Sequence, residues 1–257
     1  MVFNLHFIDY CNYHCKHCFV KKEGKELSID NIKTIIDKIA FYQQKHNEKV
    51  RVNIAGGEPL LSKNIQQIID YIYSKGLDIS IITNGYYLSE DFILKNNQKV
   101  SMIGISVDSL NEETNLLIGR CQGNKMLSKE RLITLCKIIK DNGIKLKINT
   151  CITSLNNNED INELLDTIKP DRVKVLRAFC HGDTEKYNIT DNEWDIVKSK
   201  YNNAIFEDND YMKTSYIIVD STGNLSKNNL HITNNSLLLK NVKECLDYIS
   251  HSKEEKQ

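Results

Sequence analysis

The chain has 257 residues and carries 34 basic and 34 acidic side chains, so its formal charge at neutral pH is zero. This balance excludes a general attraction to nucleic acid, and any recognition of anions has to be local. No apolar run is long enough to span a bilayer, and the starting sequence M-V-F-N-L-H-F lacks the charged and apolar regions of a signal peptide. We therefore expect a cytoplasmic protein that binds neither nucleic acid nor a membrane.

Apolar residues recur with strand and helix periods in alternation along residues 1–180. The predicted strands are 2–8, 49–55, 77–83, 100–107, 144–152 and 171–179. Helices are predicted to begin at Ser28, which can cap the first turn, at Ser62, Ser89 and Ser128, and at Asn158, where acidic residues follow. A long loop, 108–125, is predicted after the fourth strand.

Residues 181–257 show a weaker pattern. The sequence T-D-N-E from Thr190 to Glu193 is a capping box, which predicts a helix that contains Trp194. A strand is predicted at 215–220, followed by a turn at 221–224 and a last helix.

Strands that alternate with helices predict a parallel sheet with right-handed crossovers, either a doubly wound sheet or part of a (β/α) barrel. We favour an α/β fold of the partial (β/α)6 barrel kind. The length suits one large domain, and no linker rich in proline, glycine or serine divides it. We expect a single domain at 1–257, with a barrel core at 1–180 and a small α/β extension at 181–257.

Three of the eight cysteines lie together directly after the first predicted strand, in C-N-Y-H-C-K-H-C-F at residues 11–19. Cys11, Cys15 and Cys18 supply three ligands from one loop, whereas structural zinc and a saturated four-iron cluster each take four. The spacing therefore favours a 4Fe-4S cluster with one iron open to a further ligand. A zinc loop with His14 or His17 as fourth ligand is the alternative.

The other five cysteines are scattered without a pairing pattern, which indicates free thiols in a reducing compartment. Cys136 and Cys151 lie in apolar stretches, and we expect both in the core.

Polar residues follow the predicted strands at the edge where parallel α/β folds bind ligands. G-G-E-P at 56–59 follows the second strand, Asn84 follows the third, and Ser106 and Asp108 follow the fourth. Taken alone, G-G before a helix usually marks only a tight turn. Beside a cysteine loop, however, glycines admit a close backbone approach and Glu58 can receive an amino group.

Basic and amide side chains share faces of three predicted strands, because residues two apart on a strand point the same way. The sets are Arg51 with Asn53, Lys147 with Asn149, and Arg172 with Lys174. Unpaired cations inside a fold are strongly unfavourable, so the sets predict a bound polyanion. The alternative is that these side chains snorkel to solvent.

The cysteine loop followed by G-G-E-P one strand later resembles the radical S-adenosylmethionine (SAM) enzymes. Further stretches resemble the viperin family within them: I-S-V-D-S-L-N-E-E-T-N-L-L-I-G-R-C-Q-G at 105–123, then K-I-N, R-V-K-V and M-K-T-S-Y-I-I-V-D. The likeness runs from about residue 4 to about residue 220. It implies that the partial barrel is of the radical SAM type.

Viperins convert a nucleoside triphosphate into its 3′-deoxy-3′,4′-didehydro analogue, an antiviral chain terminator, and the resemblance implies the same for this chain. The implied cofactors are a 4Fe-4S cluster and SAM, whose 5′-deoxyadenosyl radical removes the ribose 4′ hydrogen. The implied partners are CTP, GTP or UTP as substrate and a flavodoxin or ferredoxin as external electron donor. We expect the enzyme to be a monomer.

Matched residue by residue, the resemblance assigns a role to each candidate site position. The cluster ligands would be Cys11, Cys15 and Cys18. SAM would be bound by Gly56, Gly57, Glu58, Asn84, Ser106 and Arg120. The nucleotide would be bound by Asn4, His6, Arg51, Asn53, Lys147, Asn149, Arg172, Lys174 and Tyr216. Tyr216 is also the candidate for catalytic proton transfer, with an ordinary strand-edge tyrosine as the alternative.

The chain departs from the viperin pattern at a few of these positions. Ala55 stands for a serine, and Arg51 stands for a lysine, which keeps the charge but changes its geometry. His17 replaces an aromatic ring and Cys121 a glycine, and neither change removes a ligand. The alternatives to a viperin-like activity are a radical SAM enzyme acting on a peptide, a base or another nucleotide, and a non-catalytic metal-binding module.

Overall fold

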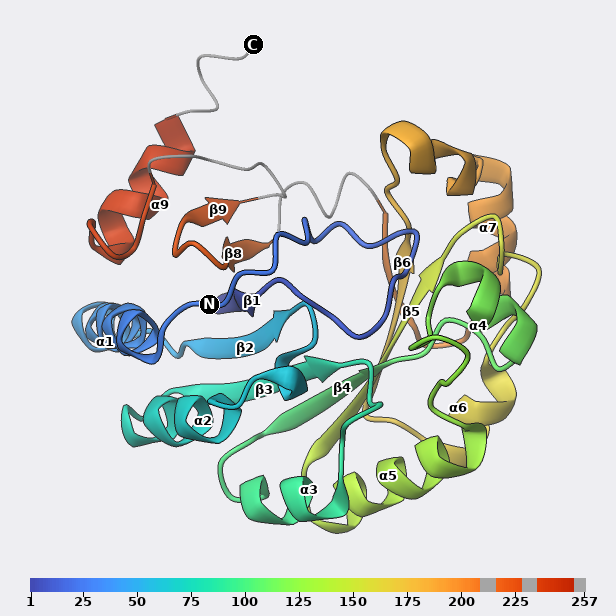
Figure 1. Ribbon diagram of the computed structural model, residues 1–257, viewed down its shortest axis with the longest axis horizontal. Helices are drawn as coiled ribbons and strands as arrows, with labels where there is room; N and C mark the ends of the chain where they lie inside the picture. Colours follow the sequence, from blue (N-terminus) through green and yellow to red (C-terminus); the bar gives the residue numbers. More distant parts are fainter. Residues whose placement is uncertain (209–215, 228–234, 252–257) are drawn as a thin grey trace. The chain divides into compact units, whose positions relative to one another are not determined.

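The computed structural model describes residues 1–208, 216–227 and 235–251 (Figure 1). Internal contacts divide the chain into two compact units. Unit 1 comprises Met1–Tyr10, Lys22–Ile81 and the described part of Met212–Gln257, and unit 2 comprises Cys11–Lys21 and the described part of Ile82–Tyr211. A barrel core at 1–180 with an extension at 181–257 stays a prediction.

Unit 1 is built on a sheet in which β2 and β8 flank β1, β3 lies beyond β2, and β9 lies beyond β8. β9 runs antiparallel to β8, and the other neighbouring pairs are parallel. The strands are β1 (Val2–Ile8), β2 (Arg51–Gly56), β3 (Asp78–Thr83, in this unit as far as Ile81), β8 (Ile217–Val219) and β9 (Leu225–Lys227). The helices are α1 (Ile29–His46), α2 (Ile65–Ser74) and α9 (Val242–His251), with a short 3-10 helix η1 (Pro59–Leu61).

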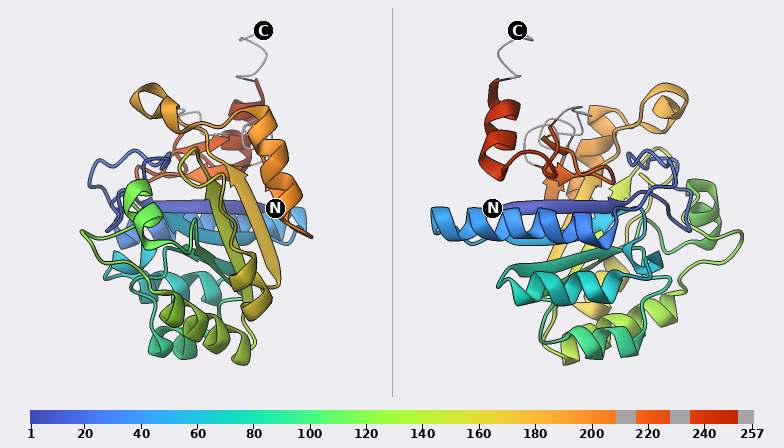
Figure 2. Two further views of the ribbon diagram at one scale, coloured as in Figure 1. Left: turned by 90° about the vertical axis from the view of Figure 1, so that its right-hand side faces the viewer. Right: turned by 60° about the vertical axis from the view of Figure 1, so that its left-hand side comes forward.

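Helix α1 shows how sequence pattern and packing agree in unit 1. The Ser28 side chain accepts a hydrogen bond from the backbone N–H of Asn31, so the predicted N-cap is confirmed. The isoleucines at three- and four-residue spacing are buried, as the period of an amphipathic helix requires. Helices α2 and α9 both pack against α1 (Figure 2).

Unit 2 has a fully parallel sheet in the order β7, β6, β5, β4. Its strands are β4 (Met102–Ser106), β5 (Lys145–Ile152), β6 (Arg172–Arg177) and β7 (Ile205–Glu207). Its helices are α3 (Glu90–Asn96), α4 (Glu112–Ile118), α5 (Lys129–Asp141), α6 (Asn162–Ile168) and α7 (Asp191–Lys200), with a 3-10 helix η2 (Gly182–Tyr187). Helix α5 packs against β5 and lies between α3 and α6, as Figure 1 shows.

The six predicted strands of residues 1–180 are confirmed, and so are the caps at Ser89, Ser128 and Thr190. The predicted start of a helix at Ser62 is wrong, because η1 comes first and α2 begins at Ile65. The Ser62 hydroxyl donates to Glu26 and accepts from the N–H of Asn64 instead. The predicted start at Asn158 is also early, since α6 begins at Asn162.

The predicted loop at 108–125 is wrong in part, because it contains α4. The Asn111 side chain caps this helix by accepting from Thr114 N–H, but Leu116 and Leu117 face solvent and leave no apolar stripe. The short strands β7 and β9 were also not predicted. Of the predicted strand at 215–220, residue 215 lies outside the described residues and β8 covers Ile217–Val219.

Within the described ranges, none of the helices has the length and apolar character needed to cross a membrane.

Candidate active site

The cysteine loop is held to the end of α4 by its backbone. The N–H of His14 donates to the carbonyl of Gly119 at 3.0 Å, and the N–H of Lys16 donates to that of Ile118 at 2.9 Å. Cys11 and Cys15 are half-buried, whereas Cys18 is exposed. The loop therefore presents its third thiol to solvent.

Gly119 ends α4 in the left-handed region, with φ of 82° and ψ of 21°. A Cβ atom there would overlap the carbonyl oxygen of His14. A side chain at this position would thus be strained and would push the helix end away from the cysteine loop.

We predict that Gly119→Ala lowers the free energy of unfolding more than Gly123→Ala does. Gly123 also has a positive φ, of 59°, but a Cβ there meets nothing within 4 Å. The control variant carries backbone strain alone, about 1–2 kcal/mol, whereas Gly119→Ala adds the overlap and should also lower the iron bound per chain. Urea unfolding and iron analysis of both variants test this, and equal losses would contradict it.

The sulfur of Cys11 receives polar hydrogens from two sides. The backbone N–H of Tyr13 donates to it at 3.3 Å, and Nδ2 of Asn84 lies 3.8 Å from it. Burial raises the pKa of the Cys15 thiol to about 11, so the thiol is protonated at pH 7 and a bound metal centre would favour loss of its proton. N–H donors and positive metal both favour the thiolate, which fits a cysteine-ligated cluster.

The structure does not choose between a cluster and a single metal ion at this loop. Among the residues that the structure describes, no three side chains of the His, Cys, Asp and Glu types are grouped closely enough to hold one metal ion. Cysteine ligands of a 4Fe-4S cluster bind different irons, whereas the ligands of a zinc ion converge on one point. The zinc loop with His14 or His17 stays an alternative.

Asp108, directly after β4, organises the polar side of the cysteine loop. Its Oδ2 lies 2.5 Å from both Nε and Nη2 of Arg120, and the side chains are 1% and 13% exposed. Burial acts to lower the pKa of Arg120, but the charge of Asp108 outweighs it and raises that pKa above its ordinary value. Oδ2 also lies 3.4 Å from Nε2 of His17, and Oδ1 accepts from the N–H of Cys151.

A pocket of about 250 Å³ lies beside this ion pair. Tyr13 of the cysteine loop lines it together with Asn84, Ser106 and Arg120. Three predicted SAM residues are thus brought together in unit 2. The Nη1 atom of Arg120 makes a long contact, 3.5 Å, with the Ser106 carbonyl, which leaves this nitrogen with capacity for another acceptor.

In unit 1, the G-G-E-P turn is fastened to the end of β1. The N–H of Gly57 donates to Ile8 at 2.8 Å, and that of Glu58 donates to Tyr10 at 3.0 Å. A Cβ at Gly56 or Gly57 would overlap these same backbone segments. The glycines therefore allow close approach of the chain to itself, and Glu58, which is 1% exposed, caps η1 through the N–H of Leu60.

A row of polar side chains crosses unit 1 at one level of the sheet. Asn53 donates to Asn4 at 2.8 Å, Ser80 donates to Asn53 at 2.7 Å, and Asn4 donates to the carbonyl of Ile217. Burial lowers the pKa of nearby His6 to about 4, so this imidazole is neutral at pH 7. The predicted sugar contacts of unit 1 are thus neutral hydrogen-bonding groups. Tyr216 is half-buried just before β8.

Two of the four predicted phosphate cations have carboxylate partners within their own unit. In unit 1, Arg51 Nε lies 2.6 Å from Asp78. In unit 2, Lys174 forms a buried ion pair with Glu207 of β7, although burial still lowers the pKa of Lys174. The expectation that both cations require an external polyanion is therefore wrong, because neighbouring strands supply the counter-charges.

The remaining basic and amide positions of unit 2 share one face of the sheet. The register pairs Lys147 with Arg172, and pairs Asn149 with both Ser106 and Lys174. Arg172 Nε and Asn149 Oδ1 are buried without a hydrogen-bond partner among the described residues.

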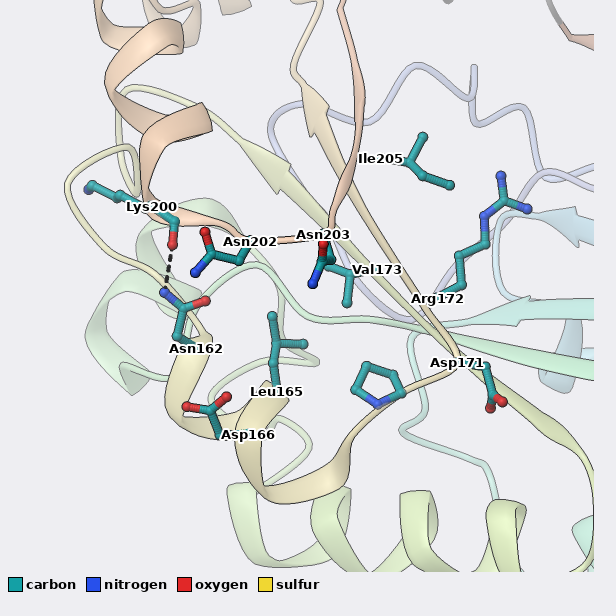
Figure 3. A pocket seen from close by; sticks show the side chains of 11 residues that line it. Asn162, Leu165, Asp166, Asp171, Arg172, Val173, Lys200, Asn202, Asn203 and Ile205 are labelled. Carbon is teal, nitrogen blue, oxygen red and sulfur yellow. Dashed lines mark hydrogen bonds between the residues drawn. The ribbon is translucent and has the colours of Figure 1, made fainter.

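A second pocket in unit 2, of about 510 Å³, lies at the start of β6 (Figure 3). Asn162 donates to the carbonyl of Lys200 across it. Arg172 belongs to its wall, but its guanidinium extends away from Leu165 and Asn203. Its polar groups do not converge, and we assign it no ligand.

Three acidic residues of these sites had no predicted role. Asp108 was predicted only as a polar group after a strand, and neither Asp78 nor Glu207 was a candidate. Glu207 could not be predicted from the sequence, because β7 has only three residues and so shows no strand periodicity. Asp78 opens a strand directly opposite Arg51, a pairing visible only once the register is known. Cys151 was expected in the core but is half-buried, and its backbone N–H donates a hydrogen bond to Asp108.

A model of the radical SAM superfamily matches residues 5–168, more than half of the chain. The chain belongs to the radical SAM superfamily. It is 32% identical over 246 residues to the S-adenosylmethionine-dependent nucleotide dehydratase of Psychrobacter lutiphocae, covering 89% of this chain and 82% of that protein. A protein of the same name from Selenomonas ruminantium is 33% identical over 240 residues, covering 86% and 84%. The predicted resemblance to the viperin family is confirmed.

The radical SAM fold is also found by structural comparison. Native anSMEcpe with bound AdoMet superimposes with a TM-score of 0.76 at 13% identity, covering 98% of this chain and 82% of that chain. At this identity the likeness shows the fold alone. The predicted fold class, an α/β partial barrel of the radical SAM type, is confirmed.

Proposed function

We propose that this chain is a viperin-like radical SAM enzyme that converts a nucleoside triphosphate into its 3′-deoxy-3′,4′-didehydro analogue. The observation that carries the proposal is the pocket next to the cysteine loop, which gathers Asn84, Ser106 and Arg120. Relatives that match over more than four-fifths of their length are named nucleotide dehydratases. The enzyme would act in the cytoplasm as a monomer.

Cys11, Cys15 and Cys18 would hold a 4Fe-4S cluster, for which the N–H donors around Cys11 are suited. With SAM, the cluster would supply a radical able to take the hydrogen from the ribose 4′ carbon. The chain's own work is to bind and orient the reactants and to exclude water from them.

For SAM, the carboxylate would be received by Arg120 and Ser106. Asp108 fixes the guanidinium of Arg120 through Nε and Nη2, and Arg120 and Ser106 line the same pocket. The amino group would be received by Glu58 with the backbone of Gly56 and Gly57. A buried carboxylate is suited to an ammonium group, since each lowers the desolvation cost of the other.

The neutral side chains of four residues would bind the sugar of the nucleotide: Asn4, His6, Asn53 and Asn149. Tyr216 would take part in the proton transfer. The triphosphate would be held by the cations Arg51, Lys147, Arg172 and Lys174. Arg51 and Lys174 are already paired with Asp78 and Glu207. Arg172, whose Nε is buried without a hydrogen-bond partner among the described residues, would therefore be the first of the four to gain from a phosphate. CTP, GTP and UTP are the expected substrates, with flavodoxin or ferredoxin supplying electrons.

The test is nucleotide-dependent cleavage of SAM. Anaerobically reconstituted protein, reduced with dithionite, should form 5′-deoxyadenosine faster with at least one of CTP, GTP, UTP and ATP than without nucleotide. Deuterium at the ribose 4′ position of that nucleotide should appear in the 5′-deoxyadenosine. Stimulation by none of the four would overturn the proposal and leave a radical SAM enzyme for a peptide, a base or another nucleotide.

A further inference from the structure

Glu26, which is not among the candidate site residues, accepts two short hydrogen bonds from residues that are distant in sequence. The hydroxyl of Tyr10 donates to its Oε2 at 2.5 Å, and the hydroxyl of Ser62 donates to its Oε1 at 2.6 Å. All three residues belong to unit 1. Hydrogen bonds to a carboxylate are about twice as strong as those between neutral groups. Glu26 therefore ties the segment after β1 to the residue that follows η1.

The backbone on either side of Glu26 is itself fixed to the end of β1. The N–H of Leu27 donates to the carbonyl of Phe7 at 2.8 Å. The N–H of Asp9 donates to the carbonyl of Lys25 at 3.0 Å, and Asp9 Oδ1 accepts from the N–H of Lys25 at 2.8 Å. A side chain that leaves a backbone held in this way has few positions open to it, so its carboxylate can hold its partners in place.

The segment that carries Glu58 is fastened at both of its ends. At its start, the N–H of Glu58 donates to the carbonyl of Tyr10. The Glu58 side chain then caps η1, and Ser62 follows η1 directly. The contacts close a ring, because the hydroxyls of Ser62 and Tyr10 meet again on the Glu26 carboxylate. The place of Glu58 in unit 1 is thus set from two sides.

We propose that Glu26 is a positioning residue for SAM, which keeps the Glu58 carboxylate where it receives the amino group. The inference rests on the proposed function, in which Glu58 is the residue that binds this group. Glu26 acts only through the hydroxyls of Tyr10 and Ser62 and does not itself bind SAM. Losing it should therefore weaken SAM binding without changing the chemical step.

The first experiment compares Glu26→Leu with Glu26→Gln in the reconstituted protein. Leucine accepts neither hydroxyl, so the KM for SAM should rise about tenfold or more, while kcat and the iron bound per chain stay unchanged. Glutamine keeps one acceptor oxygen and should recover part of the affinity. Formation of 5′-deoxyadenosine under dithionite and iron analysis measure these quantities. An unchanged KM in Glu26→Leu would overturn the proposal, and so would a loss of kcat and iron without a rise in KM.

Asp37→Leu is the matched control. Asp37 of α1 also belongs to unit 1 and accepts a tyrosine hydroxyl, that of Tyr71 at 2.8 Å, and it pairs with Lys75 at 2.5 Å. These partners lie in α2 and at its end, outside the segment that carries Glu58. The control should leave the KM for SAM unchanged. An equal rise in the two leucine variants would mean that Glu26 has no special relation to SAM.

A cycle of variants tests whether Glu26 acts through its two partners. Tyr10→Phe and Ser62→Ala each remove one hydroxyl, and each should weaken SAM binding. In the double variant Tyr10→Phe/Ser62→Ala, the added change Glu26→Leu should weaken it no further, because the groups that the carboxylate holds are already gone. SAM titration of the reconstituted proteins measures this, and a further loss of about tenfold would contradict the proposed route.

None of these measurements contains a nucleotide, so they are read separately from the nucleotide assay. A protein that no nucleotide stimulates would refute the proposed dehydratase activity and leave the effect of Glu26 on SAM intact. Full SAM affinity in Glu26→Leu would refute the role of Glu26 and leave the dehydratase activity intact.

Discussion

Replacing Cys15 by alanine is expected to abolish both cluster assembly and SAM cleavage. Cys15 is one of three thiols on a single loop, and residues 11–21 contain no further cysteine that could replace it. The unchanged protein should bind about four irons per chain after reconstitution. The variant should bind far fewer and should form 5′-deoxyadenosine only at the background rate, with or without nucleotide.

The control is Cys121→Ala, which alters a half-buried thiol three residues after the end of α4. It should keep its iron and its activity, because viperin-like sequences have a glycine there. Iron analysis, the absorbance of the cluster and product formation are measured on both variants. A Cys15→Ala protein that kept four irons and full activity would contradict the ligand set.

Asp108→Leu is expected to be the most destabilising change among the residues that hold the site. It leaves the Arg120 guanidinium buried without its carboxylate, and loss of one partner of a buried pair costs about 3–5 kcal/mol. The N–H of Cys151 would lose its acceptor as well. Because Arg120 would no longer be directed into the pocket, the KM for SAM should rise about tenfold or more.

The double variant Asp108→Leu/Arg120→Met isolates the pair. Removing both charges should restore much of the free energy of unfolding, since no buried charge is left alone, but it should not restore SAM binding. Urea unfolding of the ligand-free proteins measures the first quantity and SAM titration the second. A double variant as unstable as the single one would show that the ion pair is not what stabilises this region.

The strands and the cysteine loop were predictable because each depends on local sequence. An apolar run such as 100–107 forms a buried strand in almost any parallel sheet. The spacing of Cys11, Cys15 and Cys18 within one loop is itself typical of the ligands of an iron–sulfur cluster. Caps such as Ser28 also act within one turn of chain. The predicted helix start at Ser62 was wrong because the Ser62 hydroxyl donates a hydrogen bond to Glu26, a residue distant in sequence.

The partners of the charged residues could not be predicted in the same way. The pairs Arg51 with Asp78 and Lys174 with Glu207 join residues on neighbouring strands, and which residues face each other depends on register. Helix α4 was missed for a different reason. Its buried face consists of Thr114 and Ile118 alone, and its two leucines point to solvent, so its sequence shows no apolar stripe.

The buried pair of Lys174 and Glu207 has a consequence for which anions the proposed nucleotide site would hold. An anion gains from Lys174 only by competing with a carboxylate that is already in contact and equally shielded from water. A small anion such as inorganic phosphate would touch few other groups and so gain little from that competition, whereas a triphosphate could also reach Arg172, whose Nε is buried without a hydrogen-bond partner among the described residues. The pair would thus act as a threshold that keeps the site clear of abundant small phosphates and admits only a ligand with several charges in a row.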